Sequence, residues 1–122
     1  MSSPLSIKVE KVTLISNSEA LKILKEHHER EREATGTTSL LVQRVLEYLY
    51  KFSKVTPEKA EELRKNLVAM GLKDESIVMI MNICPTTTDE LRTLLVLEDK
   101  VFETEQLVKI INLLKEYCVE EQ

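Results

Sequence analysis

Glycine and proline are scarce in this chain, which has 2 glycines and 3 prolines among 122 residues. These residues supply most tight turns, so their scarcity favours helices joined by few connections. Leu, Val, Ile, Glu and Lys are abundant, and aromatic residues make up only 4% with no tryptophan. We therefore expect helices around an aliphatic core. The same scarcity argues against P-loop and dinucleotide-binding turns, which need several glycines close together.

The length of the chain fits one domain with a terminal arm. Apolar residues make up 43% and charged residues 31%, the balance of a soluble globular protein. No run of 18 apolar residues occurs, and the first residues, MSSPLSIKVEKV, lack a signal-peptide pattern. The expected location is the cytoplasm.

Residues 6–15 alternate between apolar and polar side chains, with Ile7, Val9, Val12 and Leu14 as the apolar members. This alternation, with its β-branched residues, predicts one strand or two very short ones. The rest of the chain offers no second strand to pair with it, so its backbone groups would be left unpaired in water. We expect the strand to add to the edge of a sheet in another protein. The alternative is a frayed and disordered N-terminus.

The first helix is predicted to begin at Ser16, because Ser16 and Glu19 have the spacing of a capping box. Its apolar face carries Leu21 and Leu24, and we expect this face to pack beside the docked strand. Residues 26–33 are charged throughout, so the far end of the helix should be solvated. The loop ATGTTS at 34–39 then forms the clearest internal boundary.

A second helix is predicted from about Ser39 to Ser53. Its apolar residues cover an arc of roughly 200°, about twice the stripe that an ordinary surface helix needs. Such a helix either lies at the centre of a bundle or buries a second face against a partner. Leu46 and Leu49 lie within this arc and are candidate partner contacts.

Four shorter helices are predicted from capping residues and apolar periodicity. Thr56, Asp74, Thr87 and Thr104 are the expected caps at their starts. The expected ends include Gly71 and the Cys84-Pro85 pair. The last helix has the clearest apolar face, formed by Leu107, Ile110, Ile111, Leu114, Tyr117 and Cys118.

These elements predict a mainly α fold with two parts. Residues 1–38 form a strand-plus-helix arm that docks on a partner, and residues 39–122 form a helical domain.

No motif for catalysis or for a cofactor emerges from the spacing. His27, His28 and Glu31 could place two metal ligands on one helix face, but no third ligand is visible, and a solvated histidine pair is the commoner case. Cys84 and Cys118 have no ligand spacing, so we expect two buried thiols; an intracellular disulfide would be plausible only in a hyperthermophile. The chain is predicted to have no activity, cofactor or metal of its own.

The charge distribution predicts only weak contact with nucleic acid. The net charge is −4, and residues 73–122 hold five basic side chains against eleven acidic ones. Phosphate binding favours a basic protein, and an acidic half repels a polyanion. The residues left for weak nucleic-acid contact lie in the middle of the chain: Lys51, Lys54, Arg64 and Lys65.

Two long segments resemble the F-type subunit of archaeal DNA-directed RNA polymerase, the counterpart of the fourth-largest subunit of eukaryotic RNA polymerase II. They are LLVQRVLEYLYKFSKVTPEKAEEL and GLKDESIVMIMNICPTTTDELRTLL. The most specific pieces are TPEKA at 56–60, NICP at 82–85 and DELR at 89–92. The resemblance covers about residues 14–117, and Cys84 stands where many relatives are expected to carry an aliphatic residue.

The resemblance implies a noncatalytic stalk subunit whose C-terminal helices are similar to the helicase-and-RNase-D C-terminal (HRDC) domain. Such subunits pair tightly with the E-type subunit of the polymerase, to whose sheet their N-terminal strand is added. The pair projects from the polymerase core and assists open-complex formation with transcription factor E, while RNA contacts belong mainly to the E-type subunit.

Two alternatives come from other classes of protein. A stand-alone HRDC-type nucleic-acid-binding module would need a basic face, which the acidic C-terminal half disfavours. A small enzyme or regulator would need a site, and the sequence shows none.

Overall fold

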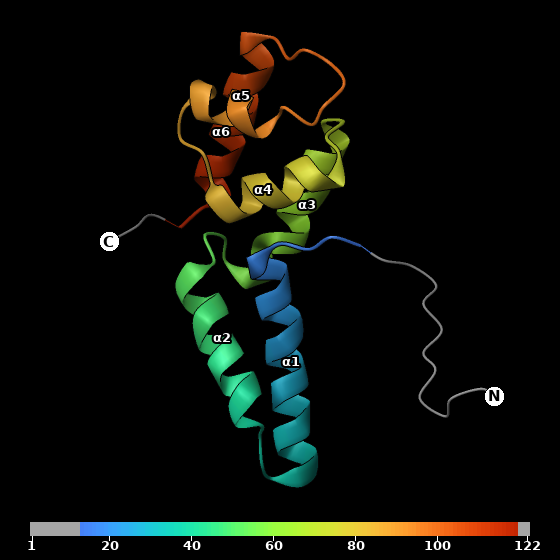
Figure 1. Ribbon diagram of the computed structural model, residues 1–122, viewed down its shortest axis with the longest axis vertical. Coiled ribbons are helices and arrows are strands. Elements are labelled where there is room, and N and C mark those ends of the chain that lie inside the picture. The colour runs from blue at the N-terminus through green and yellow to red at the C-terminus, as the bar shows by residue number, and fades with distance from the viewer. Residues whose placement is uncertain (1–12, 120–122) are drawn as a thin grey trace, which may run out of the picture.

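A computed structural model of the chain describes residues 13–119. Within this range the chain forms six α-helices and a short 3₁₀-helix, which divide into a long hairpin and a compact group of four helices (Figure 1). The mainly helical fold predicted from composition is thereby confirmed.

The hairpin consists of α1 (Asn17–Thr35) and α2 (Leu40–Phe52), which lie side by side and run in opposite directions (Figure 1). The predicted capping box at Ser16 and Glu19 is present, and Gly36 ends α1 with a left-handed φ of 76°. Leu21 and Leu49 are buried in the hairpin. The charged end of α1 lies at the far tip, as its sequence indicated.

The second part contains η1 (Pro57–Lys59), α3 (Ala60–Ala69), α4 (Asp74–Ile83), α5 (Thr88–Leu94) and α6 (Thr104–Tyr117). We refer to these helices as the bundle. They surround one aliphatic core that includes the predicted apolar face of α6. The buried residues of this core are Val55, Ala60, Leu63, Leu67, Leu72, Ile77, Ile80, Met81, Leu91, Leu95, Phe102, Leu107, Ile110, Ile111 and Leu114.

Two of the predicted helix starts are displaced by one residue. The residue before α4 is Lys73, while Asp74 lies inside the first turn, where its carboxylate contacts Arg64. The residue before α6 is Glu103, whose side chain forms a capping box with Gln106. A carboxylate accepts an amide hydrogen bond as well as a threonine hydroxyl does, so Thr104 is not required as the cap.

Thr56 stands at the predicted N-cap position, directly before Pro57, but its side chain makes no capping hydrogen bond. Its backbone carbonyl instead accepts a hydrogen bond from the Lys59 amide at 3.0 Å, which forms the 3₁₀ turn that precedes α3. Thr87, by contrast, caps α5 as predicted, since its hydroxyl accepts a hydrogen bond from the Glu90 amide at 3.2 Å. Gly71 ends α3 with a φ of 84°.

The predicted strand at 6–15 is not found in the part of it that the structure describes. Residues 13–15 have no regular structure, and residues 6–12 lie outside the described range. Residues 13–119 contain no strand, only an isolated antiparallel bridge between Val55 and Cys118. A single strand without a partner edge has no ladder to hold it extended, which is the physical reason for its absence at 13–15.

The expected division of the chain at residue 38 stays a prediction, and the packing of the hairpin favours another place for it. The structure packs α2 against α1, so the boundary at residue 38 would separate two neighbouring helices. We propose a boundary at residues 53–56, the connection between α2 and η1.

Cys84 and Cys118 form a disulfide, so the prediction of two buried thiols is wrong. Their Cα atoms lie 6.2 Å apart although 34 residues separate them in sequence. Cys84 follows the end of α4 and Cys118 follows the end of α6, so the fold places the ends of these two helices beside each other. The disulfide joins these two ends covalently.

Candidate partner interface

An apolar stripe runs along the exposed side of α2. It consists of Leu41, Val45, Tyr48 and Phe52, whose spacing places them on one face of the helix. Their exposed fractions are 71%, 38%, 58% and 46%, respectively. The rings of Tyr48 and Phe52 are in contact, with centroids 4.7 Å apart. We call these four residues the α2 stripe; a continuous exposed apolar surface of this kind is typical of a protein interaction site.

The predicted partner contacts on the helices divide by burial. Leu21 and Leu49 are buried inside the hairpin, and Leu24 and Leu46 are half-buried. Buried side chains support the hairpin and offer no surface to a partner, so direct contact by Leu21 and Leu49 is not supported.

The N-terminal contacts are mostly beyond the described residues. Leu14 is 48% exposed, and Ile7, Val9 and Val12 lie outside the described range.

The sequence did not single out the α2 stripe as a surface, although the wide apolar arc of the second helix was the signal for it. An arc of roughly 200° contains two faces. The sequence does not say which face packs on α1, and Leu46 and Leu49 fall on the face that does.

Arg64 joins the hairpin to the bundle. From α3 its guanidinium forms a bidentate ion pair with Glu19 of α1, with Nη2 donating to Oε1 at 2.9 Å. The same Nη2 donates to the backbone carbonyl of Leu14 at 2.7 Å, and Nη1 lies 3.5 Å from a carboxylate oxygen of Asp74 in α4. The side chains of Arg64 and Glu19 are only 16% and 14% exposed.

This ion pair favours the charged forms of both groups. Burial opposes ionisation of Glu19, but hydrogen bonds from Arg64 and Ser16 outweigh it and hold the pKa of Glu19 below its ordinary value. The hydrogen bond to Glu19 raises the pKa of Arg64. A second polar contact beside it ties the start of α1 to α4, because the Asn17 amide donates to Asn82 Oδ1 at 2.8 Å.

The residues predicted to touch nucleic acid have different surroundings. The Arg64 guanidinium is engaged by Glu19, Asp74 and Leu14, so it offers little to a phosphate. The side chain of Lys65 is 76% exposed, and its Nζ lies 3.5 Å from Oε1 of Glu61. Lys51 lies over the Phe52 ring at the edge of the α2 stripe.

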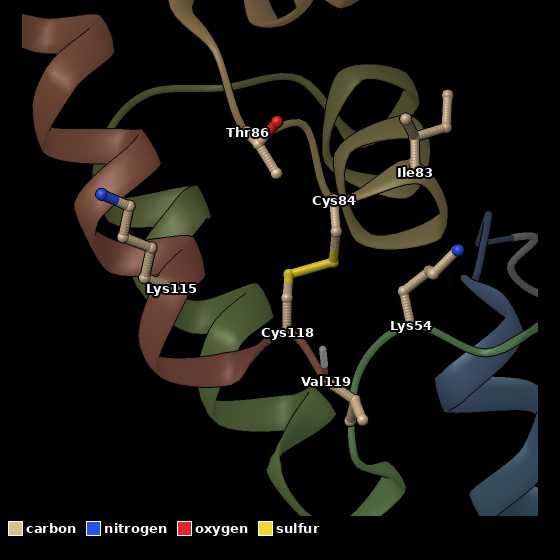
Figure 2. A pocket seen from close by; sticks show the side chains of 7 residues that line it. All are labelled: Lys54, Ile83, Cys84, Thr86, Lys115, Cys118 and Val119. Carbon is tan, nitrogen blue, oxygen red and sulfur yellow. A yellow bond between two sulfur atoms is a disulfide. The ribbon is translucent and has the colours of Figure 1, made fainter. Parts of the chain in front are cut away.

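Lys54 lies at a pocket of about 580 Å³ beside the disulfide (Figure 2). Ile83, Thr86, Lys115 and Val119 complete its wall. The Val119 amide donates to the Lys54 carbonyl at 2.7 Å. This bond ties the chain after α6 to the connection between hairpin and bundle.

Residues 13–119 contain no group of three or more His, Cys, Asp or Glu side chains placed to hold a metal ion. Of the suspected cluster, His27 Nε2 lies 3.5 Å from a Glu31 carboxylate oxygen, and His28 Nε2 is a buried atom with no hydrogen-bond partner in this part of the chain. None of the helices in that range is long and apolar enough to span a bilayer.

The sequence profile of the family described as RNA polymerase Rpb4 matches residues 14–118, which is nearly all of the chain. The chain belongs to the RNA polymerase Rpb4 family. The matched range includes the hairpin, the bundle and both cysteines. The resemblance found in the sequence is therefore confirmed at the level of an RNA polymerase subunit of the Rpb4 type.

Three archaeal relatives carry the name DNA-directed RNA polymerase subunit Rpo4. The protein from Sulfolobus acidocaldarius is 31% identical over 110 residues, covering 82% of this chain and 96% of the relative. The protein from Saccharolobus solfataricus is 32% identical over 84 residues, or 68% of this chain and 74% of the relative. The protein from Methanocaldococcus jannaschii is 30% identical over 67 residues, which cover 55% of this chain and 58% of the relative.

Proposed function

We propose that this chain is a noncatalytic, cytoplasmic stalk subunit of archaeal DNA-directed RNA polymerase. It forms a heterodimer with the E-type subunit, joins the polymerase core and assists open-complex formation together with transcription factor E. Membership in the Rpb4 family is the observation that carries this proposal. The grouping of α3 to α6 into one bundle supports an HRDC-like C-terminal domain.

The E-type subunit would contact the chain in two places. The first is the α2 stripe, whose apolar surface stays exposed in the isolated chain. The second is the predicted strand, which would be added to a sheet of the E-type subunit. The first contact would explain why the chain leaves Leu41, Tyr48 and Phe52 uncovered.

The stripe is tested with two matched tyrosines of α2. Tyr48 belongs to the α2 stripe, whereas Tyr50 is even more exposed, at 75%, and lies on another face of the helix. Tyr48→Ser should weaken binding to the E-type subunit by about 2 kcal/mol, or roughly thirtyfold in Kd, because aromatic contacts dominate interface energies. Tyr50→Ser should change Kd less than about twofold.

Calorimetric titration of each full-length variant with the purified E-type subunit gives the two constants. Equal effects of the two substitutions would mean that the stripe is not the interface. Failure of the wild-type chain to bind the E-type subunit would refute the heterodimer itself.

The alternative function as a free nucleic-acid-binding module has less support. Arg64, one of its four predicted contacts, is already paired with Glu19. Tight RNA binding by the isolated chain that survives high salt would favour that alternative.

A further inference from the structure

Four segments of the molecule meet at the Arg64 side chain. It extends from α3, pairs with Glu19 of α1, approaches Asp74 of α4 and donates to the carbonyl of Leu14. The other ion pairs across this junction, Lys22–Glu61 and Lys25–Glu58, have side chains that are 38% to 67% exposed. The Arg64–Glu19 pair is much better shielded from water, so it is the stronger constraint on the junction.

Residues 14–17 are fixed at three backbone groups. Arg64 binds the carbonyl of Leu14, Glu19 accepts from the Ser16 amide at 2.9 Å, and Asn82 accepts from the Asn17 amide. Arg64 makes the first of these bonds itself, and it also binds Glu19, which makes the second as part of the capping box. Leu14 and Ile15 have no helix or strand of their own to order them.

We propose that Arg64 is a positioning residue that sets the direction in which the chain preceding α1 leaves the bundle. This inference rests on the proposed function, because the chain so directed is the strand predicted to dock on the E-type subunit. A segment whose exit is already fixed loses less conformational entropy when it binds. Lysine cannot replace arginine here, since its single ammonium lacks the planar fork that reaches a carboxylate and a carbonyl together.

The first test needs no partner. Arg64→Lys keeps the charge but should release Leu14, and backbone NMR order parameters of Leu14 and Ile15 in the full-length chain report this directly. We expect them to fall from about 0.8 to below about 0.6. The control is Asp74→Asn, which removes a weaker contact of Arg64 and should leave both values unchanged. Unchanged order parameters in Arg64→Lys would overturn the proposal.

The second test is a double-mutant cycle, in which the Kd for the E-type subunit is measured for each combination of substitution and deletion. Arg64→Lys is made in the full chain and in a chain that lacks residues 2–12, which keeps every described helix. If Arg64 acts through the N-terminal segment, the substitution weakens binding about tenfold in the full chain and less than about twofold in the shortened one. Equal weakening in both would mean that Arg64 acts only on the hairpin, against the proposal.

The two tests separate this inference from the proposed function. If deletion of residues 2–12 leaves the affinity of the wild-type chain unchanged, the proposed strand docking is wrong, and so is the role of Arg64 in it. The order parameters still decide whether Arg64 holds Leu14.

Discussion

Reduction of the Cys84–Cys118 disulfide should destabilise the chain by about 4 kcal/mol. The bond joins residues 34 positions apart. Closing a loop of that length removes roughly 13 cal/mol/K of entropy from the unfolded chain, which is about 4 kcal/mol at 25 °C. For 122 residues, with about 2.1 cal/mol/K of unfolding entropy per residue, this corresponds to a fall in Tm on the order of 15 °C.

The measurement is urea unfolding followed by circular dichroism, with and without a dithiol reductant. The reduced protein should also show a larger m-value, because its unfolded chain is freer to expand and exposes more surface. The control is the double variant Cys84→Ser, Cys118→Ser, whose stability should not respond to reductant.

Two results would refute this reasoning. Identical urea midpoints for the oxidised and reduced wild-type protein would show that loop closure contributes nothing measurable. Two reactive thiols in protein that has been unfolded without reductant would show that the bond does not form in solution.

Three further predictions concern the hairpin and its charges. Leu49 is buried, so Leu49→Ala should lower the free energy of unfolding by about 2–5 kcal/mol. Leu41 lies on the exposed face of the same helix, so Leu41→Ala should change that free energy by less than about 0.5 kcal/mol. Thermal denaturation of the two variants makes the comparison. The pKa of Glu19 in the folded protein lies below its ordinary value of 4.5, so the ionised carboxylate stabilises the fold fully above pH 4.5. This stabilisation should disappear as the pH falls through the lower, folded pKa. Acid-unfolding curves should show this loss in the wild-type chain and not in Glu19→Gln. RNA binding by the free chain should be weak and should fall steeply as the salt concentration rises. The double variant Lys51→Ala, Lys65→Ala should bind RNA more weakly still. Filter binding at two salt concentrations measures both effects, and binding that does not depend on salt would contradict the prediction.

Local signals in the sequence were enough to find the helices. The Ser16–Glu19 capping box, the Thr87 cap and the left-handed Gly71 all act within one turn of chain, so they can be recognised without knowing the fold. Where a cap was misassigned, as at Thr104, the true cap was the neighbouring residue with an equally good acceptor. The apolar spacing of the last helix likewise identified the face that the bundle buries.

The sequence also indicated that the second helix has more apolar surface than one neighbour can cover. It could not tell which face remains free. That depends on the direction from which α1 approaches, and only the packed hairpin shows that Leu49 is covered while Leu41 and Tyr48 are not.

The contacts that join the parts were decided by tertiary structure alone. Glu19 and Arg64 lie 45 residues apart, and Cys84 and Cys118 lie 34 apart. No periodicity or capping rule extends over such distances, because those rules describe neighbours along one helix. Arg64 therefore resembled a surface cation in the sequence, and the two cysteines resembled separate thiols. Only the packing of α1 on α3, and of the end of α4 beside the end of α6, turns these residues into an ion pair and a disulfide.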